Sequence, residues 1–289
     1  MSISTAEIKQ LREATGAGIL DCKKALQQAN GNFDEAVEFL RKKGLAAAAK
    51  KAGREASEGI IDAQVSDDGQ TAVMINVNCE TDFVARTDDF KAYVDSLVEQ
   101  LFADNVTSAE ELLERPYIKD TSKTVKESLT EIVAKLGENT LISQATRFDL
   151  QGDGMLENYV HLGGRVGVLV DVAGADRDNE KFANLVHDLA LHVAAAAPLY
   201  LTESDISADT IASEKEIFKA QLAQENKPDH IKDRIIEGKL KKWYGEVVLL
   251  NQQFVKDSDL TIAQLLEKAG KEIGSSIEIR CFARYELGQ

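Results

Sequence analysis

Cysteine is scarce in this sequence, and its spacing excludes a disulfide-stabilised fold. The chain has three cysteines, Cys22, Cys79 and Cys281, which lie far apart and never form a C-x-x-C pair. An odd number of widely separated cysteines in a chain of this size does not describe a disulfide framework. We therefore interpret them as reduced thiols and expect a cytoplasmic protein.

Positive charge is also in short supply. The chain has 34 Lys and Arg against 49 Asp and Glu, a net charge of -15. Non-specific nucleic-acid binding needs basic surface that replaces phosphate counterions, so no direct nucleic-acid partner is expected. Residues 1–54 differ, because ten basic and six acidic residues give them a net +4. The amino-terminal segment is therefore a separate electrostatic unit.

Long apolar runs are absent as well. No stretch approaches the ~18 apolar residues of a membrane span. The first residues, Met1 to Glu7, enter a polar helical pattern instead of a signal peptide. We expect a soluble protein with no membrane partner that stays where it is made.

The motifs of phosphate and metal chemistry are missing too. The sequence has no Gly-x-x-x-x-Gly-Lys-Ser/Thr, no Gly-x-Gly-x-x-Gly and no His-Glu-x-x-His. Of the four histidines, only His161, before the predicted turn at Gly163-Gly164, stands where it could serve recognition. An enzyme needs a base, a nucleophile or a cofactor held in position. We therefore expect no catalytic residue, no cofactor and no metal.

The chain is long enough for several compact units. Residues 1–54 predict a head of three amphipathic helices, followed by a partly helical tether rich in alanine and lysine. The helices are expected at 4–14, 18–29 and 32–43. Thr15-Gly16 and Asn30-Gly31 supply the helix ends, because glycine accepts the left-handed conformation there. Such a tether would make the head a separate contact arm.

The core that follows repeats its plan. A hairpin, a helix and a closing strand are expected in residues 55–154, and again in 155–200 together with 246–289. Residues 201–245, inserted in the second copy, predict an antiparallel helical hairpin whose apolar stripes serve internal packing or a partner. The fold class is α+β, with two similar subdomains.

One loop sets the two copies apart. Thirteen positions separate Val77 from Phe90, but only ten separate Val172 from Phe182, and the longer loop holds Thr81-Asp-Phe-Val-Ala85. Asp82-Phe83 is therefore an addition to one copy. The pair allows two interpretations: Asp82 caps the next helix while Phe83 packs inward, or the aromatic is an exposed contact.

Several segments resemble the bacterial elongation factor Ts family, and they run in family order across almost the whole chain. Two are dense, Thr15-Gly-Ala-Gly-Ile-Leu-Asp-Cys-Lys-Lys-Ala-Leu26 and Asn78-Cys-Glu-Thr-Asp-Phe-Val-Ala85. Weaker matches are Lys135-Leu-Gly-Glu-Asn139, His161 with Arg165-Val-Gly-Val168, His192-Val-Ala-Ala195, Gly245-Glu-Val247 and Gln253-Phe-Val255.

The resemblance implies a guanine-nucleotide exchange factor for the GTPase elongation factor Tu, bound in its GDP and nucleotide-free states. The magnesium and phosphate site of that partner would be disturbed by the loop of Thr81, Asp82, Phe83 and Val84. Phe83 would enter an apolar cleft, Asp82 would disturb the magnesium, and His161 would assist.

The resemblance also implies two binding surfaces. The head would be a ubiquitin-associated-like domain that contacts the partner through Ile19, Leu20 and Lys23, and a second surface would use Phe254 and Val255. A homodimer or a two-to-two complex stays open. In many relatives a further carboxy-terminal helix is expected to contact the partner. This sequence ends at Glu286-Leu-Gly-Gln289, and we expect that contact to be absent.

Two alternatives of other classes remain. A non-catalytic scaffold would bind through the head alone and leave GDP release unchanged. A hydrolase built on Asp82 and His161 would turn over an ester or a phosphate by itself.

Overall fold

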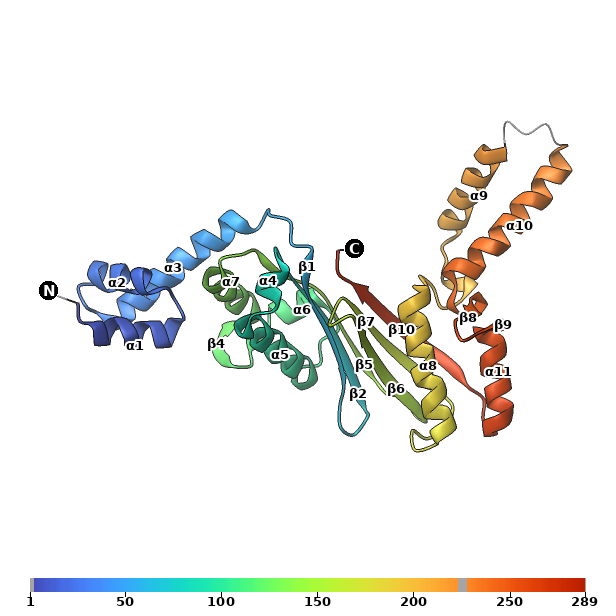
Figure 1. Ribbon diagram of the computed structural model, residues 1–289, viewed down its shortest axis with the longest axis horizontal. Helices are drawn as coiled ribbons and strands as arrows, with labels where there is room; N and C mark the ends of the chain where they lie inside the picture. The colour runs from blue at the N-terminus through green and yellow to red at the C-terminus, as the bar shows by residue number, and fades with distance from the viewer. Residues whose placement is uncertain (1–2, 223–227, 289) are drawn as a thin grey trace.

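The computed structural model describes residues 3–222 and 228–288. It is α+β, as predicted, with its sheets all antiparallel within the described chain. The head lies at one end of the molecule, the two larger sheets lie in the middle, and a pair of helices projects at the other end (Figure 1).

The head has the three expected helices, α1 (Thr5–Thr15), α2 (Ile19–Gln28) and α3 (Phe33–Lys51). Their small core contains Leu11, Cys22 and Leu26, all fully or almost fully buried. Gly16 ends α1 at φ 66°, in the left-handed region that its missing Cβ makes accessible. The likeness of this head to a ubiquitin-associated domain stays a prediction.

The tether differs from the expectation in one respect. Residues 44–51 continue α3 without a break, and this helix packs along α7 (Val125–Leu136) of the first subdomain. Arg41 forms an ion pair with Glu127, and the Lys51 ammonium donates to the Val133 carbonyl over 3.5 Å. The prediction of a separate contact arm was therefore wrong: the head rests on the core.

Two three-stranded sheets form the core of the molecule. The first has the order β1-β2-β5 and the second β10-β7-β6. Their strands are β1 (Glu58–Val65), β2 (Thr71–Cys79), β5 (Thr140–Asp149), β6 (Gly154–His161), β7 (Val166–Ala173) and β10 (Glu278–Glu286). The central strands β2 and β7 are buried along almost their whole length, because both of their faces are covered.

Each sheet has helices on its outer face, and the inner faces pack on each other (Figure 1). The first is covered by α5 (Asp88–Ala103), α6 (Ala109–Leu113) and α7, the second by α8 (Glu180–Ala196) and α11 (Ile262–Ile273). Between the sheets, Gly167 leaves no room for a side chain, since a Cβ there would lie 2.4 Å from Ile61 Cγ2. The division into subdomains at 154/155 stays a prediction.

The repeat extends further than the sequence suggested. Each copy has a small hairpin that leads into a helix with a Thr capping box. In the first copy, β3 (Pro116–Tyr117) and β4 (Asp120–Thr124) pair Tyr117 with Asp120. In the second, β8 (Gln253–Phe254) and β9 (Asp257–Thr261) pair Phe254 with Asp257 in the same register. Tyr117 and Phe254 are therefore equivalent positions.

The inserted hairpin consists of α9 (Ala208–Leu222) and α10 (Asp229–Val247), flanked by short 3-10 turns at Glu203–Asp205 and Leu249–Asn251. Part of the predicted connection, Glu225 to Pro228, lies outside the described residues. Leu222, Ile236 and Leu240 are buried, so the apolar stripes pack largely within the hairpin. Ile236 takes the buried position predicted for Ile235, which is half-buried.

Replacing the residues between Ser204 and Tyr244 with a short linker is expected to leave a folded protein. The segments on either side of the hairpin lie next to each other, since the Leu249 N–H donates to the Tyr200 carbonyl over 2.8 Å. Thermal unfolding should be followed by circular dichroism, because the deletion removes Trp243, the only tryptophan. Loss of a cooperative transition would show that the hairpin belongs to the main core.

Candidate functional site

Phe83 is the most exposed large hydrophobic side chain in the described chain, at 78 %. It lies on α4 (Asp82–Ala85), a single helical turn between β2 and α5. Thr81, rather than Asp82, caps this turn, and Thr87 caps α5 separately. The interpretation in which Phe83 packs inward behind an Asp82 cap was therefore wrong.

The residues behind Phe83 hold α4 in place. Ala85 is buried in the core of the N-subdomain, and Val84 packs against that core. The Thr81 hydroxyl donates to Glu138 Oε1 over 2.8 Å, and the Thr81 N–H donates to Glu138 Oε2 over 3.0 Å. An aromatic side chain thus faces solvent from an anchored turn.

Cys79 adds a further contact to the same turn. Its Sγ donates to the Thr81 carbonyl over 3.1 Å. Burial, together with the nearby Glu138 carboxylate, raises the pKa of the Cys79 thiol to about 12. The thiol therefore keeps its proton near neutral pH and serves as a donor instead of a nucleophile.

Asp82 is accessible from solvent. Its carboxylate is 43 % exposed and forms an ion pair of 2.8 Å with Arg86, one helical turn away. Exposed pairs of this kind contribute about 0–1 kcal/mol, because water screens them. Asp82 can leave Arg86 at little cost when another cation comes near.

His161 is the last residue of β6, immediately before the turn to β7. Its Nδ1 is 2.8 Å from the Tyr159 hydroxyl, and the two rings stack with centroids 5.7 Å apart. The next residue, Leu162, has φ 50° and is 68 % exposed. Sequence reasoning missed Leu162, because an apolar residue in a turn gives no periodic signal.

The first strand brings this turn to the same end of the molecule as α4. The Ile61 N–H donates to the Gly164 carbonyl over 2.8 Å, and the Glu58 carboxylate contacts Arg165 at 2.8 Å. Glu58 also pairs with Cys79 at the end of β2, where the loop to α4 begins. The turn after His161 and the loop that leads to Phe83 thus begin at neighbouring strand ends.

The head carries a second group of exposed hydrophobic residues. Ile19 is 57 % and Leu20 73 % exposed in the first turn of α2, and Lys23 is exposed one turn later. The exposed Ile19-Leu20 pair follows Gly18, the N-cap of α2. It is therefore presented at a helix end, with a cation beside it.

The predicted pair Phe254 and Val255 divides between core and surface. Val255 is 49 % exposed, but Phe254 is 6 % exposed and packs in the core of the C-subdomain. A direct partner contact by the Phe254 side chain does not fit this structure, which corrects the expectation. Neighbouring residues at a strand end point to opposite faces, and the sequence motif alone did not indicate which one faces inward.

His192 supports this pair from behind. It is fully buried, accepts from the Val255 N–H at Nδ1 over 3.3 Å, and contacts Gln252 Oε1 through Nε2 at 3.0 Å. Burial lowers the pKa of His192, and the Gln252 contact offsets part of this effect. The imidazole is therefore neutral, with its proton on Nε2.

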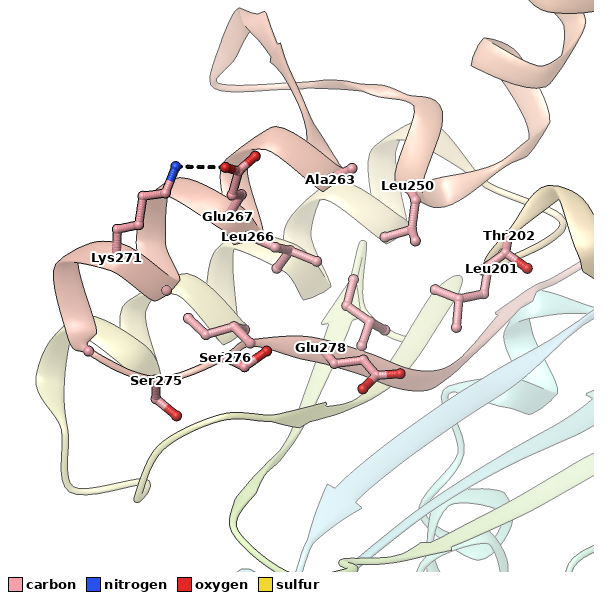
Figure 2. Close-up of a pocket in the computed structure, with 14 residues that line it drawn as sticks. Leu201, Thr202, Leu250, Ala263, Leu266, Glu267, Lys271, Ser275, Ser276 and Glu278 are labelled. Carbon is pink, nitrogen blue, oxygen red and sulfur yellow. Dashed lines mark hydrogen bonds and ion pairs between the residues drawn. The ribbon is translucent and has the colours of Figure 1, made fainter.

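No other arrangement in the described chain suggests chemistry. No group of three or more His, Cys, Asp or Glu that could hold a metal lies within residues 3–222 and 228–288. A cavity of about 630 Å³ lies between α11 and β10, and Figure 2 shows Leu201, Leu250 and Leu266 around it. Its walls are mainly apolar, with the Glu267 and Lys271 ion pair at the rim. None of the helices in the described parts is long and apolar enough to cross a membrane.

Comparison with known proteins places the chain in a family. Residues 80–289 match the sequence model of the family described as Elongation factor TS. Elongation factor Ts of Trichlorobacter lovleyi is 44 % identical over 292 residues, which cover 100 % of this chain and 94 % of the relative. The chain belongs to the elongation factor Ts family.

Two further elongation factor Ts proteins agree with this result. That of Clostridium kluyveri is 46 % identical, over 99 % of this chain and 93 % of the relative, and that of Halothermothrix orenii is 45 % identical, over 100 % and 93 %. The elongation factor Ts model begins at residue 80, just before α4. The head lies outside the match to the model but inside the matches to the relatives.

Truncating Phe83 is expected to leave stability unchanged. Phe83→Ala removes an exposed ring, so the free energy of unfolding should change by less than about 0.5 kcal/mol. Phe90→Ala is the matched control, because Phe90 is fully buried, and it should cost about 3–5 kcal/mol. Urea unfolding measures both. A large loss of unfolding free energy in Phe83→Ala would show that Phe83 packs in the core.

Replacing His192 should reduce acid sensitivity. Because burial lowers its pKa, the unfolded chain binds a proton below about pH 6.5 that the folded chain does not, and stability falls as the pH falls. His192→Gln removes this contribution. Gln is suitable because Gln100, at the equivalent place in the first copy, accepts from the Ile118 N–H over 3.1 Å.

Urea unfolding at pH 7.5 and pH 5 tests this expectation. The stability of the wild-type protein relative to His192→Gln should fall with pH by up to about 1.4 kcal/mol per unit. An equal pH dependence of the two proteins would contradict the neutral, buried state of His192.

Proposed function

We propose that this protein is a translation elongation factor that releases GDP from elongation factor Tu and so allows exchange for GTP. The exposure of Phe83 on the anchored turn α4 carries the proposal. Membership of the elongation factor Ts family supports it. The factor would act by binding alone, without covalent chemistry and without a cofactor or metal of its own.

The phenyl ring would supply the energy for exchange. Burying a Phe side chain is worth roughly 1.5–3 kcal/mol. Each ~1.4 kcal/mol used against nucleotide binding lowers its affinity about tenfold. Insertion of Phe83 into an apolar cleft beside the phosphate site of the GTPase would therefore lower the affinity of the GTPase for GDP.

Asp82 would act on the magnesium ion. Magnesium requires near-ideal octahedral oxygen geometry and bridges the phosphates of a bound nucleotide, so a displaced ligand costs much of the affinity. The Asp82 carboxylate, held only by an exposed ion pair with Arg86, would disturb this geometry. His161, at the neighbouring strand end, would assist.

Two other surfaces would hold the partner. Ile19, Leu20 and Lys23 would dock the head on the GTPase, and Val255 would provide a contact at the far subdomain, with Phe254 packed behind it. Linking several weak contacts in one rigid molecule raises the effective concentration of each. These two surfaces would thus raise the affinity for the partner, and α4 would accelerate the release of GDP.

Thermodynamic linkage completes the cycle. If the factor weakens nucleotide binding, nucleotide weakens binding of the factor by the same ratio. Incoming GTP or GDP would therefore displace the factor from a nucleotide-free complex. We include a cytoplasmic location in the proposal, and we leave the oligomeric state, a homodimer or a two-to-two complex included, to measurement.

The proposal is tested by the release of fluorescent GDP from elongation factor Tu at saturating factor. The wild-type protein should accelerate release, and Phe83→Ala should lower the maximal rate by about ten- to a hundredfold, equal to ~1.4–2.8 kcal/mol of lost transition-state contact. Unchanged GDP release with tight binding would indicate a scaffold. Hydrolysis of an ester or phosphate by the factor alone would indicate a hydrolase.

Asp82→Ala should slow release only while magnesium is present. Chelation by EDTA removes the ion that Asp82 acts on, so the variant should then approach the wild-type rate. Phe83→Ala serves as the control, because its defect should persist in EDTA. A defect of Asp82→Ala that is equal with and without magnesium would refute the assigned role.

Lys23→Glu should weaken binding without lowering the maximal rate. Rim charges mainly affect association and its salt dependence, so more factor should restore full release. Lys24→Glu, the same change at an exposed neighbour, is the control for net charge. A Lys23→Glu rate that stays far below the wild-type maximum at saturation would contradict the docking role.

A further inference from the structure

The loop between α7 and β5 is joined to the segment before Phe83 by side-chain hydrogen bonds. Its Glu138 accepts from both donors of Thr81, the N–H at 3.0 Å and the hydroxyl at 2.8 Å. Thr81 in turn caps α4 by accepting from the Val84 N–H. One carboxylate therefore fixes Thr81, the N-cap residue of α4.

The same loop holds the end of the tether. The Asn139 N–H donates to the Glu80 carboxylate over 2.6 Å, and the Asn139 side chain donates to the Arg54 carbonyl over 2.8 Å. Glu80 also contacts the Arg54 guanidinium at 3.4 Å. Glu138 and Asn139 thus lie where the chain from the head, the end of β2 and the start of α4 meet.

The second copy of the repeat lacks this carboxylate. Gly137 and Gly274 end equivalent helices in the left-handed conformation, at φ 83° and 81°. Glu138 follows the first, and Ser275, whose hydroxyl donates to the Gly174 carbonyl, follows the second. The described second copy also has no helix equivalent to α4. Glu138 and α4 therefore occur together, in one copy only.

A four-residue helix needs such support. Helix nucleation is unfavourable, and isolated helices shorter than ~12 residues are marginal in water. Of the four residues of α4, only Ala85 is buried, so tertiary packing fixes its second half better than its first. The first half, with Asp82 and Phe83, depends on the cap at Thr81.

We propose that Glu138 is a positioning residue for nucleotide exchange. By holding Thr81 it keeps α4 formed and Phe83 pointing to solvent before the partner binds, so that no binding energy is used to order the turn. This inference rests on the proposed function. It assigns a task to the Lys135-Leu-Gly-Glu-Asn139 motif, which neither Phe83 nor Asp82 explains.

Two measurements on Glu138→Ala test the proposal. Hydrogen–deuterium exchange followed by mass spectrometry should show faster exchange in a peptide covering residues 79–87, where α4 lies. Maximal GDP release from elongation factor Tu should fall about tenfold at saturating factor, because the turn must then be ordered during each encounter. Glu138→Gln keeps one acceptor oxygen and should give an intermediate rate of GDP release. This variant tests the proposal even if Glu138→Ala does not fold.

A combined variant separates positioning from general damage. If Glu138 acts through the two exposed side chains of α4, Glu138→Ala should slow wild-type factor but add nothing in an Asp82→Ala/Phe83→Ala background. Ser275→Ala, which removes the equivalent loop contact in the second copy, should leave both the exchange of residues 79–87 and the GDP release rate unchanged.

The outcomes are distinguishable. Additive losses when Glu138→Ala is combined with Asp82→Ala/Phe83→Ala, or a wild-type rate in Glu138→Ala despite a loosened turn, would overturn the positioning role while the proposed function stood. No acceleration of GDP release by wild-type factor would overturn the proposed function, and the inference with it.

Discussion

The two hydrogen bonds from Thr81 to the Glu138 carboxylate connect parts of the chain that are 57 residues apart. They join the end of β2 to the loop after α7, and α4 begins from that junction. A large aromatic ring in water would normally turn toward the nearest apolar surface. Here the ring faces outward because the backbone beneath it is fixed by the cap and by buried Ala85. The shape of the candidate site is therefore a property of the loop contacts and not of Phe83 itself.

The duplicated scaffold provides the rigid frame for this junction. Helices cover the outer face of each sheet, and the inner faces of the two sheets pack against each other. Gly167 allows the sheets to approach closely at Ile61. The contacts of β1 with the turn after β6 bring the ends of both sheets together. In one copy the segment after the hairpin forms α4, and in the other it is a loop without a helix. The exposed aromatic of α4 is therefore not required by the cores that the two copies share.

Much of the fold could be predicted from the sequence, for physical reasons that differ between elements. Gly16 and the alternating residues of β2 carry strong local signals, so helix ends and strands were found. The continuation of α3 to Lys51 was predicted only as a partly helical tether, because the unbroken helix depends on packing against α7 and not on a large apolar face of its own. Likewise, Phe254 faces inward because it packs against His192 and the surrounding core. No local sequence pattern indicates this packing. The exposure of Phe83 needed the structure too, since a capped inward turn and a capped outward turn share one sequence pattern. The exchange and docking roles of these residues stay predictions.

We propose that Phe83, which is exposed in the free factor, becomes buried against the GTPase. Incorporating 4-fluorophenylalanine at position 83 and recording its fluorine NMR signal tests this directly. In the free factor the signal should shift when H2O is replaced by D2O, because the ring is 78 % exposed. After addition of GDP-bound elongation factor Tu, the account predicts that this solvent shift disappears. A fluorine that keeps its full solvent shift in the complex would contradict it.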